Sequence, residues 1–472
     1  MNSQQRDANA KRLTTQVLNG LSKEQLIEMV LKLDERVTEL ERRLGMNSQN
    51  SSKPPSSDPP WTKPPRAPGM ERKPGGQPGH PGHGRRLLPQ DQVDQIVPVK
   101  PKTCQRCGAA LCGEDAAPRR HQVTELPAMR AKVVEYVLHT LYCPQCGMLT
   151  SAELPQGVPT GVLGERLVAA VAVLVGTGHL SRRMTAMLLE HLFGAKLSVA
   201  TVAGCCEMAS QALAQPVQQC HDYVQQQGAA NIDETGWREQ NQRAWVWVMS
   251  TAVAAVFQIG RSRGRDALQK LLGSFCGILG SDRWGAYTVY GTARRQLCWA
   301  HLIRDFRQFL EGTGQAPKIG QQLLDQTTQM FRWWHRVRDA TVQRTQFQSW
   351  MIGHRRRVER ILRRGTHCGD RPTERTSKRI LKLAPALWTF AWIPGVEPTN
   401  NAAERAIRPL VLWRKGCFGS HSEAGSRFVE RMMSVTATLK LQHRNVVEYV
   451  TEACHAYIHK EQPPSLHPAA HT

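Results

Sequence analysis

Apolar residues near the start of the chain recur with the spacing of a coiled coil. Between residues 26 and 44 they are spaced alternately four and three residues apart, which places them along one side of a helix. The pattern predicts a helix that pairs two copies of the chain. A helix packed on its own protein is the alternative, because the repeat spans fewer than three heptads. The seam comprises Leu26, Val30, Leu33, Val37, Leu40 and Leu44.

The segment that follows contains little that could form a core. Ser, Pro, Gly, Lys and Arg dominate residues 47–86, and such a composition cannot bury enough apolar area to offset the entropy of ordering. We therefore divide this part of the chain into an N-terminal helix (1–46) and a disordered basic linker (47–97). Whether the linker binds anything or is simply solvated stays open.

A helical pattern occupies residues 160–222. It predicts helices over 163–175, 181–193 and 198–213, with Ser181 and Ser198 as N-caps of the second and third and Gly194 at the end of the second. Three short helices joined by small turns favour a helix-turn-helix-like DNA-binding domain. A purely structural helical bundle is the alternative.

The pattern then changes to strands, within a domain that we place at 228–455. Strands are predicted at 229–233, 245–249 and 255–259, followed by a helix at 265–272 and a fourth strand at 277–282. Three strands, a helix and a fourth strand begin a ribonuclease-H-like fold. Residues 309–396 form a predicted helical insertion in this domain, and residues 456–472 a flexible tail.

Size and charge indicate a multidomain protein with a polyanionic partner. The chain has 472 residues, which predicts several folded units, and a net charge of +23. Nucleic acid is therefore the expected partner. The longest apolar run, 167–175, is too short to span a bilayer of about 30 Å, and residues 1–11 lack the apolar segment of a secretion signal. We expect a cytoplasmic, nucleoid-associated protein whose 13 cysteines are reduced thiols.

Four of these cysteines have the spacing of zinc ligands. Cys104 and Cys107 form one pair, Cys143 and Cys146 form another, and a glycine follows each pair. Two residues between thiolates let both sulfurs face one ion, so the two pairs predict one structural Zn²⁺ in a zinc ribbon over 98–155. We expect the intervening residues 133–138 to form a strand, and Cys112 to have no role in the site.

Two aspartates follow predicted strands. Asp233 ends the first strand and Asp282 the fourth, so both lie at the ends of neighbouring strands, where they could share a metal ion. The ordinary role of such aspartates is to cap turns. Glu234 should point to the opposite face of its strand and is therefore a decoy, that is, an acid near the site that we do not expect to bind metal. Asp266, Asp305 and Glu423 are further decoys for which this expectation is less secure.

A third acid, Glu404, lies on a later helix. Thr399 or Asn400 caps this helix, which we expect to be short because Pro398 and Pro409 bound it. Carboxylate oxygens are the ligands that Mg²⁺ and Mn²⁺ prefer, and two such ions about 3.5 to 4 Å apart stabilise both oxygens of a phosphodiester displacement. A surface ion pair with a neighbouring arginine is the ordinary alternative for such a glutamate.

The order of these features resembles the transposases of the insertion-sequence-66 type, which have an Asp-Asp-Glu active site. The resemblance runs from about residue 25 to about residue 455 and rests on the paired cysteines and five further motifs. These are NSQNSSKPPS at 47–56, DETGW at 233–237, DRWGAY at 282–287, CWAHLIR at 298–304 and NNAAER at 400–405.

The resemblance implies that Asp233, Asp282 and Glu404 bind two Mg²⁺ or Mn²⁺ ions. In that hypothesis Asp233 bridges both ions while Asp282 and Glu404 each hold one. The site would cut transposon ends and transfer the freed strand to target DNA. Partners would be double-stranded DNA, further copies of the chain and small accessory proteins.

Several arginines are candidates for DNA contact. Arg405 and Arg408 flank the third acid and could hold the scissile phosphate, although Arg405 could instead pair with Glu404. Arg355, Arg356 and Arg357 begin a basic surface in the predicted insertion, for which a solvated helix face is the alternative. Cys298 and His301 are spaced like metal ligands, but we expect no nearby partner for them and interpret them as part of a packed helix.

Two other functions are compatible with the sequence. A nuclease of the same fold would hydrolyse DNA or RNA without joining ends. A zinc-containing DNA-binding regulator would have no catalysis, and the retained acids Asp233, Asp282 and Glu404 argue against it.

Overall fold

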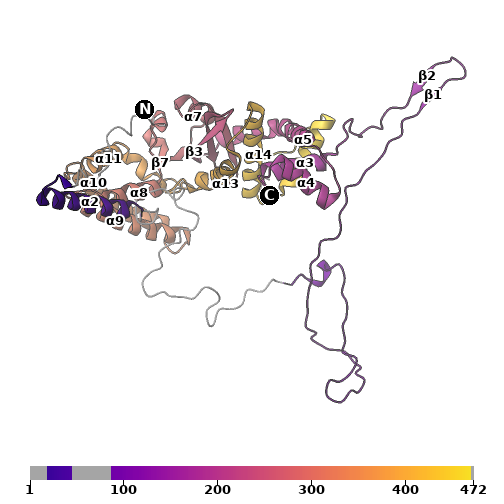
Figure 1. Cartoon of the computed structure of the whole chain (residues 1–472), viewed down its shortest axis with the longest axis horizontal. Coiled ribbons are helices and arrows are strands. Elements are labelled where there is room, and N and C mark those ends of the chain that lie inside the picture. The colour runs from indigo at the N-terminus through magenta and orange to yellow at the C-terminus, as the bar shows by residue number, and fades with distance from the viewer. Residues whose placement is uncertain (1–18, 45–86, 469–472) are drawn as a thin grey trace. The chain divides into compact units, whose positions relative to one another are not determined.

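The computed structural model describes residues 19–44 and 87–468 (Figure 1). The chain divides into two compact units: the smaller comprises Pro65–Val134 and Leu188–Ala195, and the larger comprises the remaining residues. Residues 47–86, most of the predicted linker, lie outside the described residues. The predicted domain boundaries therefore stay predictions.

Helix α2 (Lys23–Leu44) contains the predicted seam. The seam residues from Val30 to Leu44 have exposed fractions between 49% and 85%, so the apolar side of α2 is open. On another side, Lys32 pairs with Glu28 one turn earlier at 2.6 Å. The helix is confirmed, whereas its pairing with a second copy stays a prediction. No helix in the described part of the chain is long and apolar enough to cross a membrane.

Four helices lie between residue 164 and the first strand of the central sheet, and the first three match the predicted ones. Their caps match as well: the Ser198 hydroxyl accepts a hydrogen bond from the Thr201 N–H at 3.0 Å, and the Ser181 hydroxyl accepts one from the Met184 N–H at 3.2 Å. Gly194 ends the second helix with a φ of +67°, a conformation that favours glycine. The helices are α3 (Glu165–Gly176), α4 (Arg182–Phe193), α5 (Val199–Ala212) and α6 (Ala214–Gln225).

A five-stranded sheet with the order β5-β4-β3-β6-β7 lies at the centre of the larger unit (Figure 1). Strands β3, β4 and β5 are antiparallel, whereas β6 and β7 run parallel to β3. Four strands and one helix occur in the predicted order; β7 has no predicted counterpart, because three residues are too few to show a period. The bounds are β3 (Ala229–Glu239), β4 (Gln242–Ser250), β5 (Ala255–Gly260), α7 (Arg265–Leu272), β6 (Ile278–Ser281) and β7 (Arg295–Leu297), with short 3₁₀ helices η4 (Gly285–Val289) and η5 (Thr292–Arg294) between the last two.

Helix α14 (Glu423–Leu441) covers the open edge of this sheet. Three side chains one turn apart, Glu430, Ser434 and Thr438, accept hydrogen bonds from alternate N–H groups of β5. Four residues of a helix rise about 6 Å and two residues of a strand about 6.6 Å, so the two repeats match. The edge N–H groups of β5 are thus satisfied by side chains instead of another strand.

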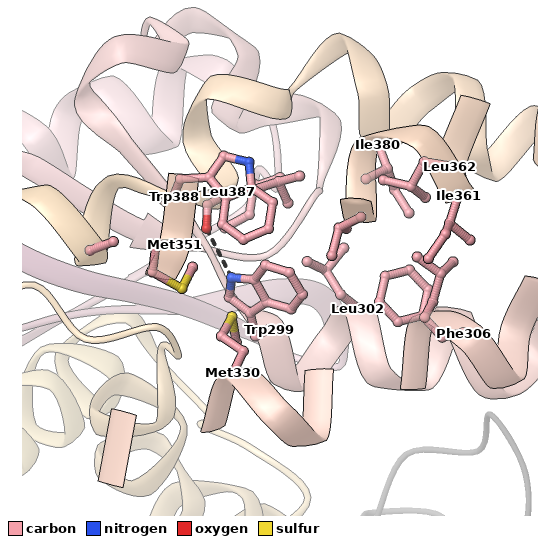
Figure 2. Packing of buried hydrophobic residues seen from close by; sticks show 14 of the residues in the cluster. Trp299, Leu302, Phe306, Met330, Met351, Ile361, Leu362, Ile380, Leu387 and Trp388 are labelled. Atoms are coloured by element: carbon pink, nitrogen blue, oxygen red, sulfur yellow. Dashed lines mark hydrogen bonds between the residues drawn. The ribbon is translucent and has the colours of Figure 1, made fainter. Parts of the chain in front are cut away.

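Helices fill the residues between β7 and the third acid, as predicted. Their shared core includes Trp299 and Trp388, both almost fully buried, whose ring centroids lie 5.2 Å apart. Figure 2 shows the Trp299 indole N–H donating to the Leu387 carbonyl at 2.9 Å, which ties the two ends of this segment together. The elements are α8 (Trp299–Leu310), α9 (Ala316–Arg338), α10 (Arg344–Gly365), α11 (Arg371–Lys382), η6 (Ala384–Leu387) and α12 (Thr389–Trp392).

Helix α13 (Asn401–Cys417), which carries the third acid, is longer than predicted. The expected boundary at Pro409 is wrong, because Pro409 lies inside the helix. A proline there removes one backbone hydrogen bond and costs about 3 kcal/mol. Tertiary contacts offset this cost: Leu410 is fully buried, and the Arg414 side chain donates to the Gly236 carbonyl of β3. The last helix is α15 (Val446–His459).

The strand expected at 133–138 is also wrong. These residues are exposed and lie outside the strands, and no segment in the described part of the chain forms a strand ladder with them. Their β-propensity is therefore not supported by strand pairing. Strand pairing occurs instead around the second cysteine pair, between β1 (Thr140–Tyr142) and β2 (Leu149–Ser151).

The core between α8 and α12 yields a stability prediction. Leu302 is fully buried in it (Figure 2), so Leu302→Ala should lower the free energy of unfolding by about 2 to 5 kcal/mol. Leu310 on the same helix is 39% exposed, and Leu310→Ala should change it by only about 0.5 kcal/mol. Chemical denaturation measures both; equal losses would contradict the burial assigned to Leu302.

Candidate active site

Two strands of the sheet place Asp233 and Asp282 side by side. The parallel pairing of β3 with β6 ends with Asn231 opposite Gly280, and each aspartate follows two residues later on its own chain segment. The two carboxylates therefore lie at the same level and on the same face. The expectation that the first strand ends at Asp233 is wrong, because β3 continues to Glu239. It continues because β4 pairs with it from Asn231 to Glu239.

The third acid reaches the same place through Asn400. This residue precedes α13 as predicted, but its side chain does not cap the helix. It is fully buried, and its amide N–H₂ donates to the carbonyl of Ile232 at 3.2 Å, the residue before Asp233. Glu404 lies in the first turn of α13, so this hydrogen bond fixes the third acid against the strand of the first.

The charges of the three acids interact. Burial, together with the neighbouring charges of Glu234, Glu404 and Asp282, raises the pKa of Asp233 to about 8. Burial also raises the pKa of Glu404, with Asp282 adding to this rise and Arg304 and Arg405 opposing it. The structure thus brings all three predicted acids into one electrostatically coupled cluster.

Cys298 and His301 belong to this site, contrary to expectation. Together with Glu404 they form a group of ligand atoms that all lie within 4.8 Å of one another. His301 Nδ1 is 3.5 Å from Glu404 Oε1, and both atoms are buried without a hydrogen-bond partner among the described residues. Burial and the charges of Arg304 and Arg283 lower the pKa of His301 to about 3, so its imidazole is neutral. More than 100 residues separate Cys298 from Glu404, so sequence spacing gave no signal of this contact.

Glu234 has a separate set of partners. Its side chain is 2% exposed, pairs with Arg263 at 2.7 Å and accepts a hydrogen bond from the Tyr287 hydroxyl. The Arg263 guanidinium lies between the rings of Trp245 and Trp284, 4.7 and 4.0 Å from their centroids. The Glu234 oxygens are therefore occupied within the protein, whereas Glu404 Oε1 is not.

The same network holds the loop after Asp282. The Trp284 N–H donates to Asp282 Oδ1 at 2.8 Å, and Arg283 pairs with Asp305 at 2.5 Å. The decoy carboxylates Glu234 and Asp305 thus each neutralise an arginine beside the site. Asp266 and Glu423 lie exposed at the starts of α7 and α14.

The predicted DNA-contacting arginines differ in their surroundings. Arg405 and Arg408 are exposed on α13, next to the third acid. On α10, Arg355 pairs with Glu359 at 2.8 Å, and Arg357 donates to Gln326 at 3.4 Å. Arg356 is exposed on the same helix.

Each cysteine pair forms a tight turn of the same design. In the first pair, the Gly108 N–H donates to the Cys104 carbonyl at 2.9 Å with a glycine φ of +74°; in the second, Gly147 and Cys143 repeat this with 2.9 Å and +72°. Backbone N–H groups of the following residues lower the pKa of the Cys104 and Cys143 thiols. The first pair belongs to the smaller unit and the second to the larger, so a joint four-cysteine site stays a prediction.

The raised pKa of Asp233 predicts how pH affects the metal-free protein. The folded state holds a proton that the unfolded state loses above about pH 4, so stability should fall as the pH rises from about 4 to about 8. Asp233→Asn removes this loss and should stabilise the metal-free protein at pH 8 by on the order of 1 to 3 kcal/mol.

Thermal unfolding in chelator at several pH values measures this effect. Asp266→Asn, at an exposed aspartate, is the control and should keep the slope of the wild type. A wild-type slope that survives in Asp233→Asn would show that another group causes it.

Comparisons with known proteins give one family model for the N-terminal part of the chain and two similar proteins. A family model described as "Family of unknown function (DUF6444)" matches residues 2–86. Two proteins of Sinorhizobium fredii are similar to the chain. "Uncharacterized protein y4hP" is 22% identical over 405 residues, which are 76% of this chain and 71% of that protein. "Uncharacterized protein y4qI" is 25% identical over 246 residues, so the match covers 44% of this chain and 43% of that relative's length.

A second family model, "Transposase IS66 family", matches residues 160–427. The match includes the helices α3 to α6, the sheet, the helical segment and all three acids of the candidate site. Because it extends over more than half of the sequence, the chain belongs to the transposase IS66 family.

Proposed function

We propose that this protein is a DNA transposase that cuts transposon ends and joins them to target DNA with Asp233, Asp282 and Glu404. The observation that carries the proposal is the convergence of these acids from β3, the end of β6 and the first turn of α13. Burial, together with the charges of Glu234, Glu404 and Asp282, raises the pKa of Asp233 to about 8, and strongly shifted pKa values of this kind are concentrated at functional sites.

The sheet supports a ribonuclease-H-like catalytic domain. Its order β5-β4-β3-β6-β7, with three antiparallel strands followed by two parallel ones, continues the predicted succession of strands. The helical segment between β7 and α13 then corresponds to the predicted insertion. In this arrangement the acids come from the central strand, its parallel neighbour and the helix after the insertion.

The residues fit a pair of hard divalent ions. All three acids offer oxygen ligands, as Mg²⁺ and Mn²⁺ prefer, and the buried Glu404 Oε1 has no hydrogen-bond partner among the described residues. When bound, such ions generate the nucleophile and stabilise charge on the attacking and leaving oxygens. The neutral imidazole of His301, 3.5 Å from Glu404, adds no positive charge to the cluster.

The chain's own residues place the DNA. Arg405 and Arg408, exposed beside Glu404, bind the phosphate at which the strand is cut, and α10 contributes Arg355, Arg356 and Arg357 farther along the duplex. Water cuts the transposon end, and the freed 3′-hydroxyl then attacks a phosphodiester of the target. One set of carboxylates thus serves both displacements without a covalent protein–DNA intermediate.

Other parts of the chain assemble the complex. The open apolar side of α2 pairs with a second copy as a coiled coil, because its seam residues are exposed within a single chain. The helices α3 to α5, in a helix-turn-helix-like arrangement, and the zinc ribbon recognise the transposon ends. Small accessory proteins complete the active assembly.

Cleavage and joining of labelled transposon-end DNA in Mg²⁺ or Mn²⁺ test the proposal. Asp233→Ala, Asp282→Ala and Glu404→Ala should each lower both activities by about 100-fold or more, while DNA binding is kept. Joined product distinguishes a transposase from a nuclease, which would release cut ends only.

Two controls match these variants in charge. Asp266→Ala removes an exposed carboxylate and should leave activity unchanged. The second control is Glu234→Gln, at the decoy next to Asp233. Glutamine is used instead of alanine because it keeps the side-chain shape, whereas Glu234→Ala would leave Arg263 without its partner. Full activity in any of the three triad variants would refute the metal assignment. An inactive wild type, with candidate accessory proteins present, would favour the regulator.

The zinc ribbon makes an independent prediction. Cys104→Ser and Cys143→Ser should each lose the same single bound Zn²⁺, because four thiolates are needed to close one tetrahedral site. Cys112→Ser, at an exposed cysteine outside both pairs, should keep it. Elemental analysis measures the zinc content. If each pair bound zinc without the other, the shared site would be disproved.

A further inference from the structure

Helices α3 and α15 bring three potential metal ligands together outside the carboxylate site. Glu165 is the first residue of α3, and His455 and His459 lie one turn apart near the end of α15. The Glu165 Oε1 atom is 3.3 Å from His459 Nε2 and 3.5 Å from His455 Nδ1. The two imidazole rings lie 4.3 Å apart between centroids. One carboxylate oxygen and two ring nitrogens thus all lie within 4.8 Å of one another.

These separations fit a tetrahedral metal ion. Zinc binds imidazole nitrogen and carboxylate oxygen at about 2.0 to 2.2 Å, which places two tetrahedral ligands about 3.3 to 3.5 Å from each other. We propose that Glu165, His455 and His459 bind one first-row transition-metal ion, with Zn²⁺ as the best match. The proposal does not rest on the transposase function.

The donor set selects this class of ion. Two imidazoles and one carboxylate suit zinc and its first-row neighbours, whereas Mg²⁺ prefers oxygen ligands alone. These donors therefore differ in kind from the carboxylates of Asp233, Asp282 and Glu404, which offer oxygen alone.

A further carboxylate, that of Glu461, lies beside the proposed ligand His455. Glu461 Oε2 lies 3.7 Å from Nε2 of His455, the ring nitrogen that faces away from Glu165. Metal-bound histidines usually donate their second N–H to a carboxylate, a backbone carbonyl or water, which orients the ring and makes it a better ligand. Glu461 occupies the position of such an outer partner.

The site has room for a fourth ligand. A cavity of about 410 Å³ borders Glu165 and His455 and is lined also by Thr451, Glu452 and Gln462. Three protein ligands leave one position of a tetrahedron open, and water can reach it through this cavity.

The ion would link segments that are far apart in the sequence. It joins the first turn of α3 to the last turn of α15, which packs along α3. His455 and His459 lie beyond residue 427, where the transposase family match ends. The site thus uses a part of the chain that the match does not cover.

Zinc content of the full-length protein tests the proposal. The protein is stripped with chelator and dialysed against Zn²⁺ in excess Mg²⁺, and the double variant His455→Gln/His459→Gln is compared with the wild type by elemental analysis. We expect the double variant to hold one zinc equivalent fewer. His421→Gln, at an exposed histidine outside the cluster, should match the wild type. The difference between proteins is used because the cysteine pairs and the acids can also take up metal.

Two further variants separate metal binding from folding. Glu461→Gln keeps all three ligands and should weaken zinc binding by about 10- to 100-fold, as loss of an outer partner does. The side chain of His455 is 51% exposed, so the single variant His455→Gln should fold like the wild type and lose the rise in melting temperature that zinc gives. Equal zinc content in the wild type and the double variant, or an equal zinc-induced rise in His455→Gln, would overturn the proposal.

Discussion

The register between β3 and β6 is the constraint on which the candidate active site depends. It pairs Asn231 with Gly280 and so carries Asp233 and Asp282 to one level. Residue 280 is glycine, and an added Cβ would lie 2.3 Å from the Asn231 side-chain oxygen, so the Asn231 side chain would have to move. A slip of one residue would turn one aspartate to the opposite face of the sheet. Since Asn400 binds the same strand, all three acids take their position from β3.

The carboxylates around the site form two groups, which differ in whether an arginine neutralises them. The outer ones are neutralised inside the protein, Glu234 by Arg263 and Asp305 by Arg283. The inner ones are held together without such partners, although burying like charges is unfavourable. Packing elsewhere in the fold offsets this unfavourable free energy. Functional sites are commonly destabilising in this way and are held in place by the stable structure around them. The outer pairs also keep the loops around the inner acids in fixed positions.

Local signals predicted much of this protein, and long-range contacts account for what they missed. Caps such as Ser198 mark helix starts because the hydrogen bond involved is local. The aspartates could be found because strand periodicity shows where a strand runs. By contrast, Pro409 continues a helix only because distant packing outweighs a local penalty. Cys298 meets Glu404 only after the helical segment between them has folded, so no sequence spacing could reveal that contact. The IS66 family resemblance is confirmed, while the chemistry assigned to the acids stays a proposal.

The side chains of α14 that cover β5 have a consequence for the order of events during synthesis. They lie 171 to 183 residues after the strand positions they contact. On the ribosome, β5 therefore emerges long before its cover, and its edge N–H groups face water until most of the remaining chain has been made. The sheet that carries Asp233 is completed late, as folds built on distant contacts generally are. A chain released before α14 is made would keep an exposed strand edge, which is a template for aggregation.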